Sequence, residues 1–152
     1  MLPIVTAPNN VLSQVAKKVG KIDRQVLDFI EEMKQSLASA KDPEGVGLAS
    51  PQVGKSLRIF IIKQSPKAKV SIFINPKIIE KSQELVPLSR PKKSKNKKAG
   101  KLEGCLSLPN IWGPVLRAPS VKLQYLDETG RQHVKMFKGV FATIIQHEYD
   151  HI

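Results

Sequence analysis

The residues best suited to chemistry are His147-Glu148-Tyr149-Asp150-His151, close to the end of the sequence. Residues four positions apart share one face of an α-helix, so His147 and His151 can bind the same metal ion. Glu148 would lie beside that ion, where a carboxylate can act as a general base. The HExxH pattern therefore predicts a metal site to which one helix contributes two imidazoles.

We expect the third protein ligand to come from earlier in the chain, because only Ile152 follows His151 in this sequence. Cys105 is the first candidate, since it is the only cysteine. His133 is the rival, but it falls in a predicted strand and we interpret it as an exposed hairpin histidine. One thiolate and two imidazoles leave a fourth position for water. The cation lowers the pKa of that water and gives a hydroxide nucleophile near neutral pH.

Proton transfer and charge stabilisation can be assigned to residue types in the same way. Glu148 would take the proton of the attacking water and later deliver it to a leaving amine. A tetrahedral intermediate carries an oxyanion, which requires hydrogen-bond donors. The side-chain amide of Gln52 and the backbone N–H of Leu106, next to Cys105, are groups of the right kind. These residues together indicate a metal-dependent amide hydrolase.

Helical spacing and glycine content predict where a substrate would lie. Three residues share the metal-facing side of the last helix with His147, at seven, four and three positions before it: Val140, Thr143 and Ile144. They could form the floor of an apolar pocket beside the ion. The glycine-rich segments at residues 45–47, which include Val46 and Gly47, and at Gly104 would let the backbone approach a peptide closely and pair with it as a strand does.

Length and composition indicate a single catalytic domain over residues 1–152. A chain of 152 residues with 41% hydrophobic content can form its own core. The lone cysteine excludes an internal disulfide and suits a reducing cytoplasm. We find no signal peptide and no apolar run of membrane-spanning length. We therefore expect a cytoplasmic protein without a membrane partner, and we assume a monomer.

The predicted elements favour an α+β fold. Apolar residues at steps of three and four predict a helix over residues 22–40. A second helix should begin near Gly139. Its core-facing stripe consists of Phe141, Ile145 and Tyr149. Strand-like runs lie between these helices, at residues 57–62 and 70–75 and in a hairpin over residues 121–137. We expect antiparallel strands packed around the C-terminal metal-binding helix, with one additional N-terminal helix.

A lysine-rich segment at about residues 90–101 holds much of the net charge of +12. It contains seven basic residues, no acidic residue and no apolar periodicity, which predicts a mobile, solvated loop. The loop could bind the ribosome by contacting phosphates of ribosomal RNA through salt-sensitive attraction. The alternative interpretation is a surface insertion without a partner.

Three motifs together resemble the signature motifs of peptide deformylases, in that family's order. They are Gly45-Val46-Gly47-Leu48-Ala49-Ser50-Pro51-Gln52, Glu103-Gly104-Cys105-Leu106-Ser107 and Gln146-His147-Glu148-Tyr149-Asp150-His151. The opening residues and Phe73-Ile74-Asn75-Pro76 are also similar, so the resemblance covers nearly the whole chain. It implies removal of the N-formyl group from the initiator formyl-methionine of nascent peptides, with release of formate.

The resemblance also implies roles for particular residues. By it, Cys105, His147 and His151 bind one divalent metal ion, Glu148 is the general acid/base, and Gln52 and Leu106 hold the oxyanion. The family's natural metal is typically Fe²⁺, and Zn²⁺, Ni²⁺ or Co²⁺ can occupy the site. Arg117 resembles the family's arginine near the peptide groove.

The sequence departs from the family pattern at three places. Ser50 stands where a second alanine is usual, and the lysine-rich segment resembles an insertion. Family members also normally continue beyond the last histidine, so we expect this sequence to be truncated at its C-terminus. Two other functions stay open: a zinc peptidase of the HExxH type, and a non-catalytic, basic ribosome- or RNA-binding protein on a deformylase-like scaffold.

Overall fold

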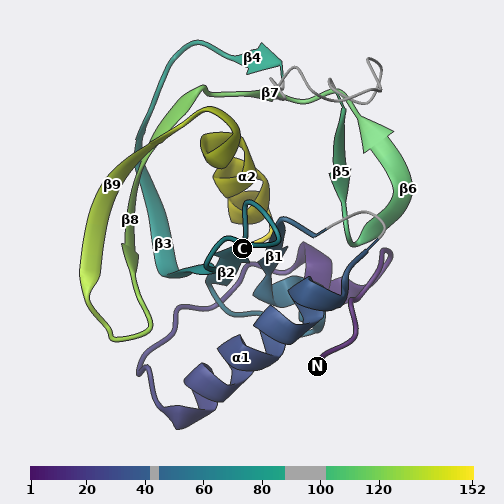
Figure 1. Cartoon of the computed structure of the whole chain (residues 1–152), viewed down its shortest axis with the longest axis vertical. Coiled ribbons are helices and arrows are strands. Elements are labelled where there is room, and N and C mark those ends of the chain that lie inside the picture. Colours follow the sequence, from purple (N-terminus) through teal and green to yellow (C-terminus); the bar gives the residue numbers. More distant parts are fainter. Residues whose placement is uncertain (42–44, 88–101) are drawn as a thin grey trace.

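The largest of the antiparallel sheets lies between the two α-helices of the residues that the structure describes (Figure 1). The structure is a computed structural model that describes residues 1–41, 45–87 and 102–152. The predicted lysine-rich loop at residues 90–101 lies outside these ranges. None of the helices in the described ranges is both long and apolar enough to cross a membrane.

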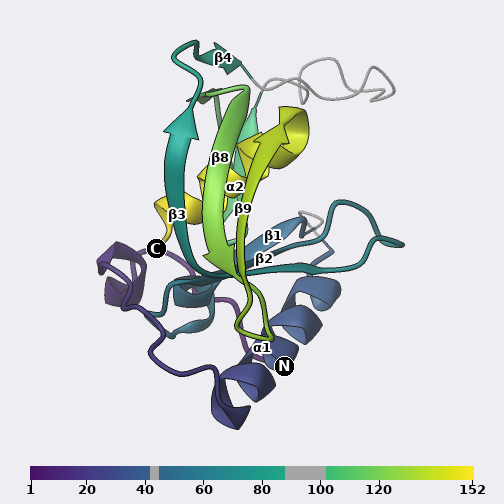
Figure 2. The ribbon, with the colours of Figure 1, turned by 90° about the vertical axis from the view of Figure 1, so that its left-hand side faces the viewer.

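The main sheet has five strands in the order β1-β2-β3-β8-β9. Their bounds are Gly47–Ala49 for β1, Ile59–Ile62 for β2, Ser71–Lys81 for β3, Ser120–Leu126 for β8 and Gln132–Lys138 for β9. The first part of β3 pairs with β2 and the rest pairs with β8, and the register shifts after Ile74. As a result β3, β8 and β9 extend together away from β1 and β2 (Figure 2).

In the described part of the chain, two small sheets and two short 3-10 helices accompany the main sheet and the α-helices. β4 (Val86–Pro87) pairs with β7 (Leu116–Arg117), and β5 (Glu103–Cys105) pairs with β6 (Leu108–Gly113). The 3-10 helices are η1 (Asn10–Ser13) and η2 (Ser50–Val53). The strands β5 and β6 lie outside the main sheet, and both contribute residues to the candidate site.

Helix α1 (Arg24–Ser39) covers one face of the sheet. It begins after Asp23, whose carboxylate accepts a hydrogen bond from the backbone N–H of Val26. Such an N-cap satisfies a donor that has no partner within the helix. The buried side of α1, which includes Ile30 and Met33, packs with Ile59 and other β2 and β3 residues in one core cluster.

Helix α2 (Gly139–Asp150) packs on the opposite face, in a second core cluster that contains Ile145, Phe60 and Phe73. Side chains alternate between the two faces along a strand, so β2 can contribute to both clusters. Ile59 and Ile61 belong to the α1 side, and Phe60 and Ile62 belong to the α2 side. The fully apolar run of β2 therefore reflects burial on both faces.

Gln146 fixes the position of α2 against the start of β8. Its Nε2 donates to the carbonyl oxygen of Ala118 at 2.8 Å, and its Oε1 accepts from the N–H of Ala118 at 3.0 Å. Ala118 is fully buried and Gln146 is 7% exposed. The side chain thus satisfies two buried backbone groups at once, one residue before His147.

The α+β prediction is confirmed, including the N-terminal helix, the C-terminal helix and the antiparallel pairing. The helix expected over 22–40 spans Arg24–Ser39, and the predicted hairpin is formed by β8 and β9. The prediction missed β1, β4, β5, β6 and β7. Four of these strands have two or three residues, which is too short for alternation to be recognised.

We predict that Gln146→Ala destabilises the metal-free protein by about 2–4 kcal/mol, because it leaves both backbone groups of Ala118 buried without partners. Urea unfolding in the presence of EDTA measures this loss without a contribution from metal binding. Gln132→Ala, which removes an exposed amide in β9, is the matched control and should change stability little. Equal unfolding free energies for the two variants would contradict the role of Gln146.

Candidate functional site

Three potential metal ligands meet where β5 approaches α2. The ligand atoms of Cys105, His147 and His151 all lie within 4.8 Å of one another. Nε2 of His151 is 3.4 Å from the sulfur of Cys105 and 3.3 Å from Nε2 of His147. The three residues expected from the sequence to share one cation are therefore brought together.

The rival ligand His133 is not part of this group. It lies in β9, where its Nε2 is 2.7 Å from Oδ2 of Asp127 and its ring stacks on Tyr125. Its side chain is 23% exposed, so it is more buried than expected for a hairpin histidine. The contact with Asp127 explains its position without a metal.

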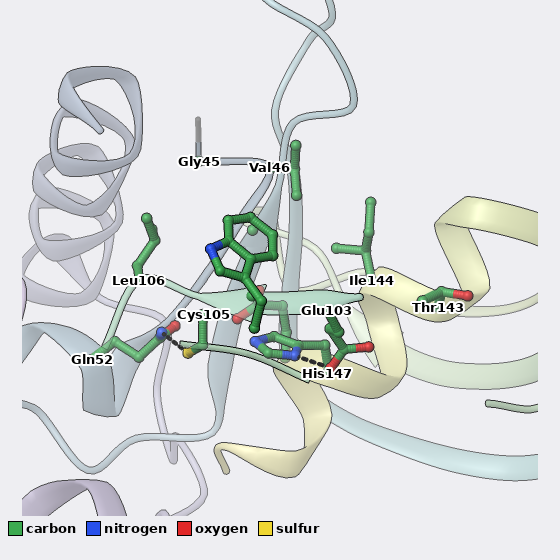
Figure 3. A pocket seen from close by; sticks show the side chains of 13 residues that line it. Gly45, Val46, Gln52, Glu103, Cys105, Leu106, Thr143, Ile144 and His147 are labelled. Atoms are coloured by element: carbon green, nitrogen blue, oxygen red, sulfur yellow. Dashed lines mark hydrogen bonds and ion pairs between the residues drawn. The ribbon is translucent and has the colours of Figure 1, made fainter. Parts of the chain in front are cut away.

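Glu103 orients the first imidazole. Its Oε1 is hydrogen-bonded to Nδ1 of His147 (Figure 3). A proton on Nδ1 leaves Nε2, which lies 3.3 Å from Nε2 of His151, available to a cation, and this is the tautomer that a metal ligand requires. Burial would raise the pKa of Glu103, but hydrogen bonds and charges from His147 and Arg117 outweigh it and lower the pKa to about 2. Glu103 is thus an anion at neutral pH.

The charge state of the three candidate ligands suits a cation. Burial would raise the pKa of the Cys105 thiol, but hydrogen bonds from His147 and His151 outweigh it and hold the pKa below its usual range. Burial would lower the pKa of His147, but Cys105 and the two nearby glutamates hold it above its usual range. The metal-free site therefore favours a thiolate, the form of cysteine that binds metals.

Gln52 presents its amide N–H group to the same place. Its Oε1 accepts a hydrogen bond from the N–H of Ala49 at 2.8 Å, which fixes the orientation of the amide. Its Nε2 then donates to the Cys105 sulfur at 3.4 Å (Figure 3). It also donates to Oγ of Ser107 at 3.3 Å. Gln52 is 1% exposed. A neutral donor held in this way has the properties of an oxyanion-hole group.

The N-terminal segment links the two turns that carry these groups. The N–H of Val5 donates to the carbonyl oxygen of Gln52 at 2.7 Å, and the N–H of Ala7 donates to that of Ser107 at 3.0 Å. One extended segment is therefore hydrogen-bonded both to η2 and to the turn after β5. These two hydrogen bonds fix the position of Gln52 relative to the turn that follows Cys105.

Glu148 is 3% exposed, and its Oε2 is buried without a hydrogen-bond partner among the residues that the structure describes. Burial raises the pKa of Glu148 to about 7, although the neighbouring imidazoles oppose this. A buried carboxylate oxygen without a partner is rare and points to a water, ion or substrate that completes it. The observation fits a site that holds a cation with an attached water beside this oxygen.

Gly47 makes room for that carboxylate. A Cβ atom at Gly47 would lie 2.3 Å from Oε1 of Glu148, closer than two such atoms can approach. At Gly104 a Cβ atom would lie 2.6 Å from the ring of Trp112. Packing therefore requires glycine at both positions, because a side chain would collide with Glu148 or with Trp112. The sequence did not reveal this requirement, which adds to the predicted approach of a peptide.

A cavity of about 110 Å³ opens beside these groups (Figure 3). Ten of the thirteen residues predicted for the site line it: Val46, Gly47, Gln52, Gly104, Cys105, Leu106, Thr143, Ile144, His147 and Glu148. His151 adjoins it through the ligand cluster. Val140 and Arg117 are not among the lining residues; Val140 is 39% exposed, and Arg117 forms ion pairs with Glu103 and Asp150.

Sequence reasoning missed three residues of the site. Glu103 contacts His147, Ser107 contacts Gln52, and Trp112 lines the cavity. A signal existed for Glu103, because residues two apart in a strand share a face and Glu103 precedes Cys105 by two. Trp112 gave no such signal, since it reaches the cavity only through the pairing of β6 with β5.

Comparison with known proteins gives a consistent result. The family model for polypeptide deformylase matches residues 1–152. The peptide deformylase of Treponema pallidum (strain Nichols) is 38% identical over 141 residues, covering 93% of this chain and 76% of that protein. That of Christiangramia forsetii is 35% identical over 167 residues, covering all of this chain and 77% of that protein.

Solved structures agree. The crystal structure of peptide deformylase from Thermotoga maritima has a TM-score of 0.83 with 32% sequence identity, over 99% of this chain and 90% of that one. These matches do not support the alternatives of a zinc peptidase or a non-catalytic RNA-binding protein. The chain belongs to the peptide deformylase family, the metal-dependent hydrolases that remove the N-formyl group from nascent peptides.

Proposed function

We propose that this chain carries out the family's reaction with Cys105, His147 and His151 as ligands to one divalent metal ion and Glu148 as general acid/base. The observation that carries the proposal is the convergence of one sulfur and two imidazole nitrogens beside a buried carboxylate oxygen without a partner. When bound, a divalent cation supplies Lewis acidity, which activates a water and polarises a carbonyl.

The chain's own residues move the proton. Glu148 accepts the proton of the water that attacks the formyl carbon, and it then donates this proton to the peptide nitrogen as the C–N bond breaks. The products are formate and a free amine. The raised pKa of Glu148 suits this cycle, because a carboxyl group that titrates near neutral pH can act both as base and as acid.

Two donors serve the oxyanion in this proposal. The amide of Gln52 and the backbone N–H of Leu106 would stabilise the negative charge on the former carbonyl oxygen. Support comes from the bond between Ala49 and Oε1 of Gln52, which leaves Nε2 to face the sulfur of Cys105.

The methionine side chain would occupy the apolar part of the cavity. Thr143 and Ile144 form its helical wall, and Val46, Gly47 and Gly104 supply backbone to the peptide. We leave Val140 and Arg117 out of the proposed peptide contacts, because neither lines the cavity.

The metal, location and partners belong to the same proposal. We infer Fe²⁺ as the native ion, with Zn²⁺, Ni²⁺ or Co²⁺ able to bind the same thiolate and imidazoles. We infer a cytoplasmic monomer that meets formyl-methionyl peptides as they leave the ribosome. Ribosome contact through residues 90–101 stays a prediction, since this segment lies outside the described residues.

We predict that the protein reconstituted anaerobically with Fe²⁺ releases formate from a formyl-methionyl peptide and that Glu148→Gln lowers kcat about 10²–10⁴-fold. The amide keeps the shape of the carboxylate but cannot accept the proton. Metal content should be unchanged, because Glu148 is not a proposed ligand. EDTA-treated protein is the negative control, and Glu80→Gln, in β3 away from the site, is the matched substitution. Parent-like turnover by Glu148→Gln would exclude the proposed role.

We predict that Gly47→Ala lowers kcat about 10²-fold with little change in metal content, because the new methyl group must displace the Glu148 carboxylate by about 1 Å. Formate release and elemental analysis measure the two quantities. Gly113→Ala is the matched control, since a Cβ atom at this β6 residue would meet no other atom within 4 Å. If both variants retained full activity, the close contact with Glu148 would not matter for catalysis.

We predict that protein purified without air contains iron and that peroxide inactivates it, because both Fe²⁺ and the thiolate of Cys105 can be oxidised. Elemental analysis identifies the metal, and residual formate release measures the inactivation. Zinc-reconstituted protein should lose activity more slowly, since zinc has no redox chemistry. Zinc in the purified protein, together with activity that is stable in peroxide, would contradict iron as the native ion.

A further inference from the structure

Arg117 joins the end of α2 to β5. Its Nη2 donates to Oε1 of Glu103 at 2.7 Å, and its Nε donates to Oε2 of the same carboxylate at 3.3 Å. Its Nη1 donates to Oδ2 of Asp150 at 2.5 Å. The Arg117 side chain is 13% exposed. One guanidinium therefore holds a strand carboxylate on one side and a helix carboxylate on the other.

Each carboxylate lies next to a proposed metal ligand. Glu103 precedes Cys105 by two residues and is bonded to Nδ1 of His147. Asp150 directly precedes His151 and is the last residue of α2. Arg117 is thus connected to all three ligands through its two partners, although the ligand cluster does not include it.

The two imidazoles differ in what holds them. His147 is hydrogen-bonded through Nδ1 to Glu103. Among the residues that the structure describes, the ring nitrogens of His151 contact only the two other proposed ligands, Cys105 and His147, through Nε2. The position of the second imidazole therefore depends on contacts made by neighbouring residues of its turn, and the pair of Asp150 with Arg117 is one of them.

We propose that Arg117 is a positioning residue that holds the last turn of α2, and with it His151, against β5, so that all three donors reach one cation. This inference rests on the metal ligation proposed above. It differs from the role implied by the family resemblance, in which Arg117 lies near the peptide groove. Its ion pairs direct the guanidinium toward two carboxylates, and it does not line the cavity.

The geometry of arginine matters here. The planar guanidinium binds the Glu103 carboxylate through two N–H groups and still has Nη1 for Asp150, whereas a lysine ammonium has no such fork. The Glu103 side chain is 12% exposed and that of Asp150 is 63% exposed. Solvent screens the second pair more, so loss of Asp150 should have the smaller effect.

The test is the rate at which zinc-loaded protein releases metal to excess chelator. Arg117→Met should release the ion 10–100-fold faster than the parent chain, the usual effect of removing a group that supports metal ligands. Arg117→Lys should also release it faster, because charge alone does not replace the fork. Asp150→Asn should give a smaller increase, and it should add little in the double variant with Arg117→Met, since both act through one contact.

The matched control is Lys122→Met. It removes another ion pair, that of Lys122 with Glu80 at 3.9 Å between β8 and β3, and should leave the release rate unchanged. The KM for a formyl-methionyl peptide, measured with saturating metal, should be the same in the parent and in all Arg117 and Asp150 variants. Neither residue contacts the peptide in this proposal.

Parent-like metal release by both Arg117→Lys and Asp150→Asn would overturn the inference, and so would an increase in KM without faster release. These two variants decide the matter even if Arg117→Met does not fold, because they are conservative and Asp150 is largely exposed. Absence of formate release by the metal-loaded parent would overturn the proposed function instead. It would leave the comparison of metal release rates unaffected.

Discussion

The approach of β5 to α2 is the constraint on which the site depends. The strand supplies a sulfur and the helix supplies two imidazoles, so no element can form the ligand set alone. Gln146 fixes the helix against Ala118, two residues before β8, and Glu103 joins the strand to His147. Leu106, next to Cys105, packs against the core cluster on the α1 side of the main sheet, and Ile145 of α2 belongs to the cluster on the other side. Both segments that meet in the site are thus anchored in the core.

Burial of charge is tolerated in the site because each charged group has a partner. The thiolate of Cys105 faces imidazoles, and the carboxylate of Glu103 faces His147 and Arg117. Glu148 is different, since one of its oxygens is buried without a hydrogen bond among the described residues. Such a group costs about 1–3 kcal/mol of stability. In the proposed function a bound cation and its water would supply the missing partner at this oxygen, where the proton transfer is proposed to occur.

The sequence predicted the parts of the fold and site that depend on local periodicity. The stripe that includes Ile30 and Met33 predicted α1 to within two residues at its start, and the four-residue spacing of His147 and His151 predicted two imidazoles on one face. The third ligand came from a different kind of argument, namely that Cys105 is the only cysteine. The short strands could not be predicted in this way, because two or three residues show no period.

Residue spacing along the sequence could not predict contacts between distant segments. Arg117 could be assigned from its motif to the peptide groove, yet its guanidinium lies between Glu103 and Asp150, which are 47 residues apart in the chain. Gly47 likewise suggested room for a peptide, and the structure fills the space above it with the Glu148 carboxylate. In both cases the residue type indicated a geometry: Arg117 offers a forked group of donors, and Gly47 has no side chain. The tertiary fold decided which groups each residue contacts.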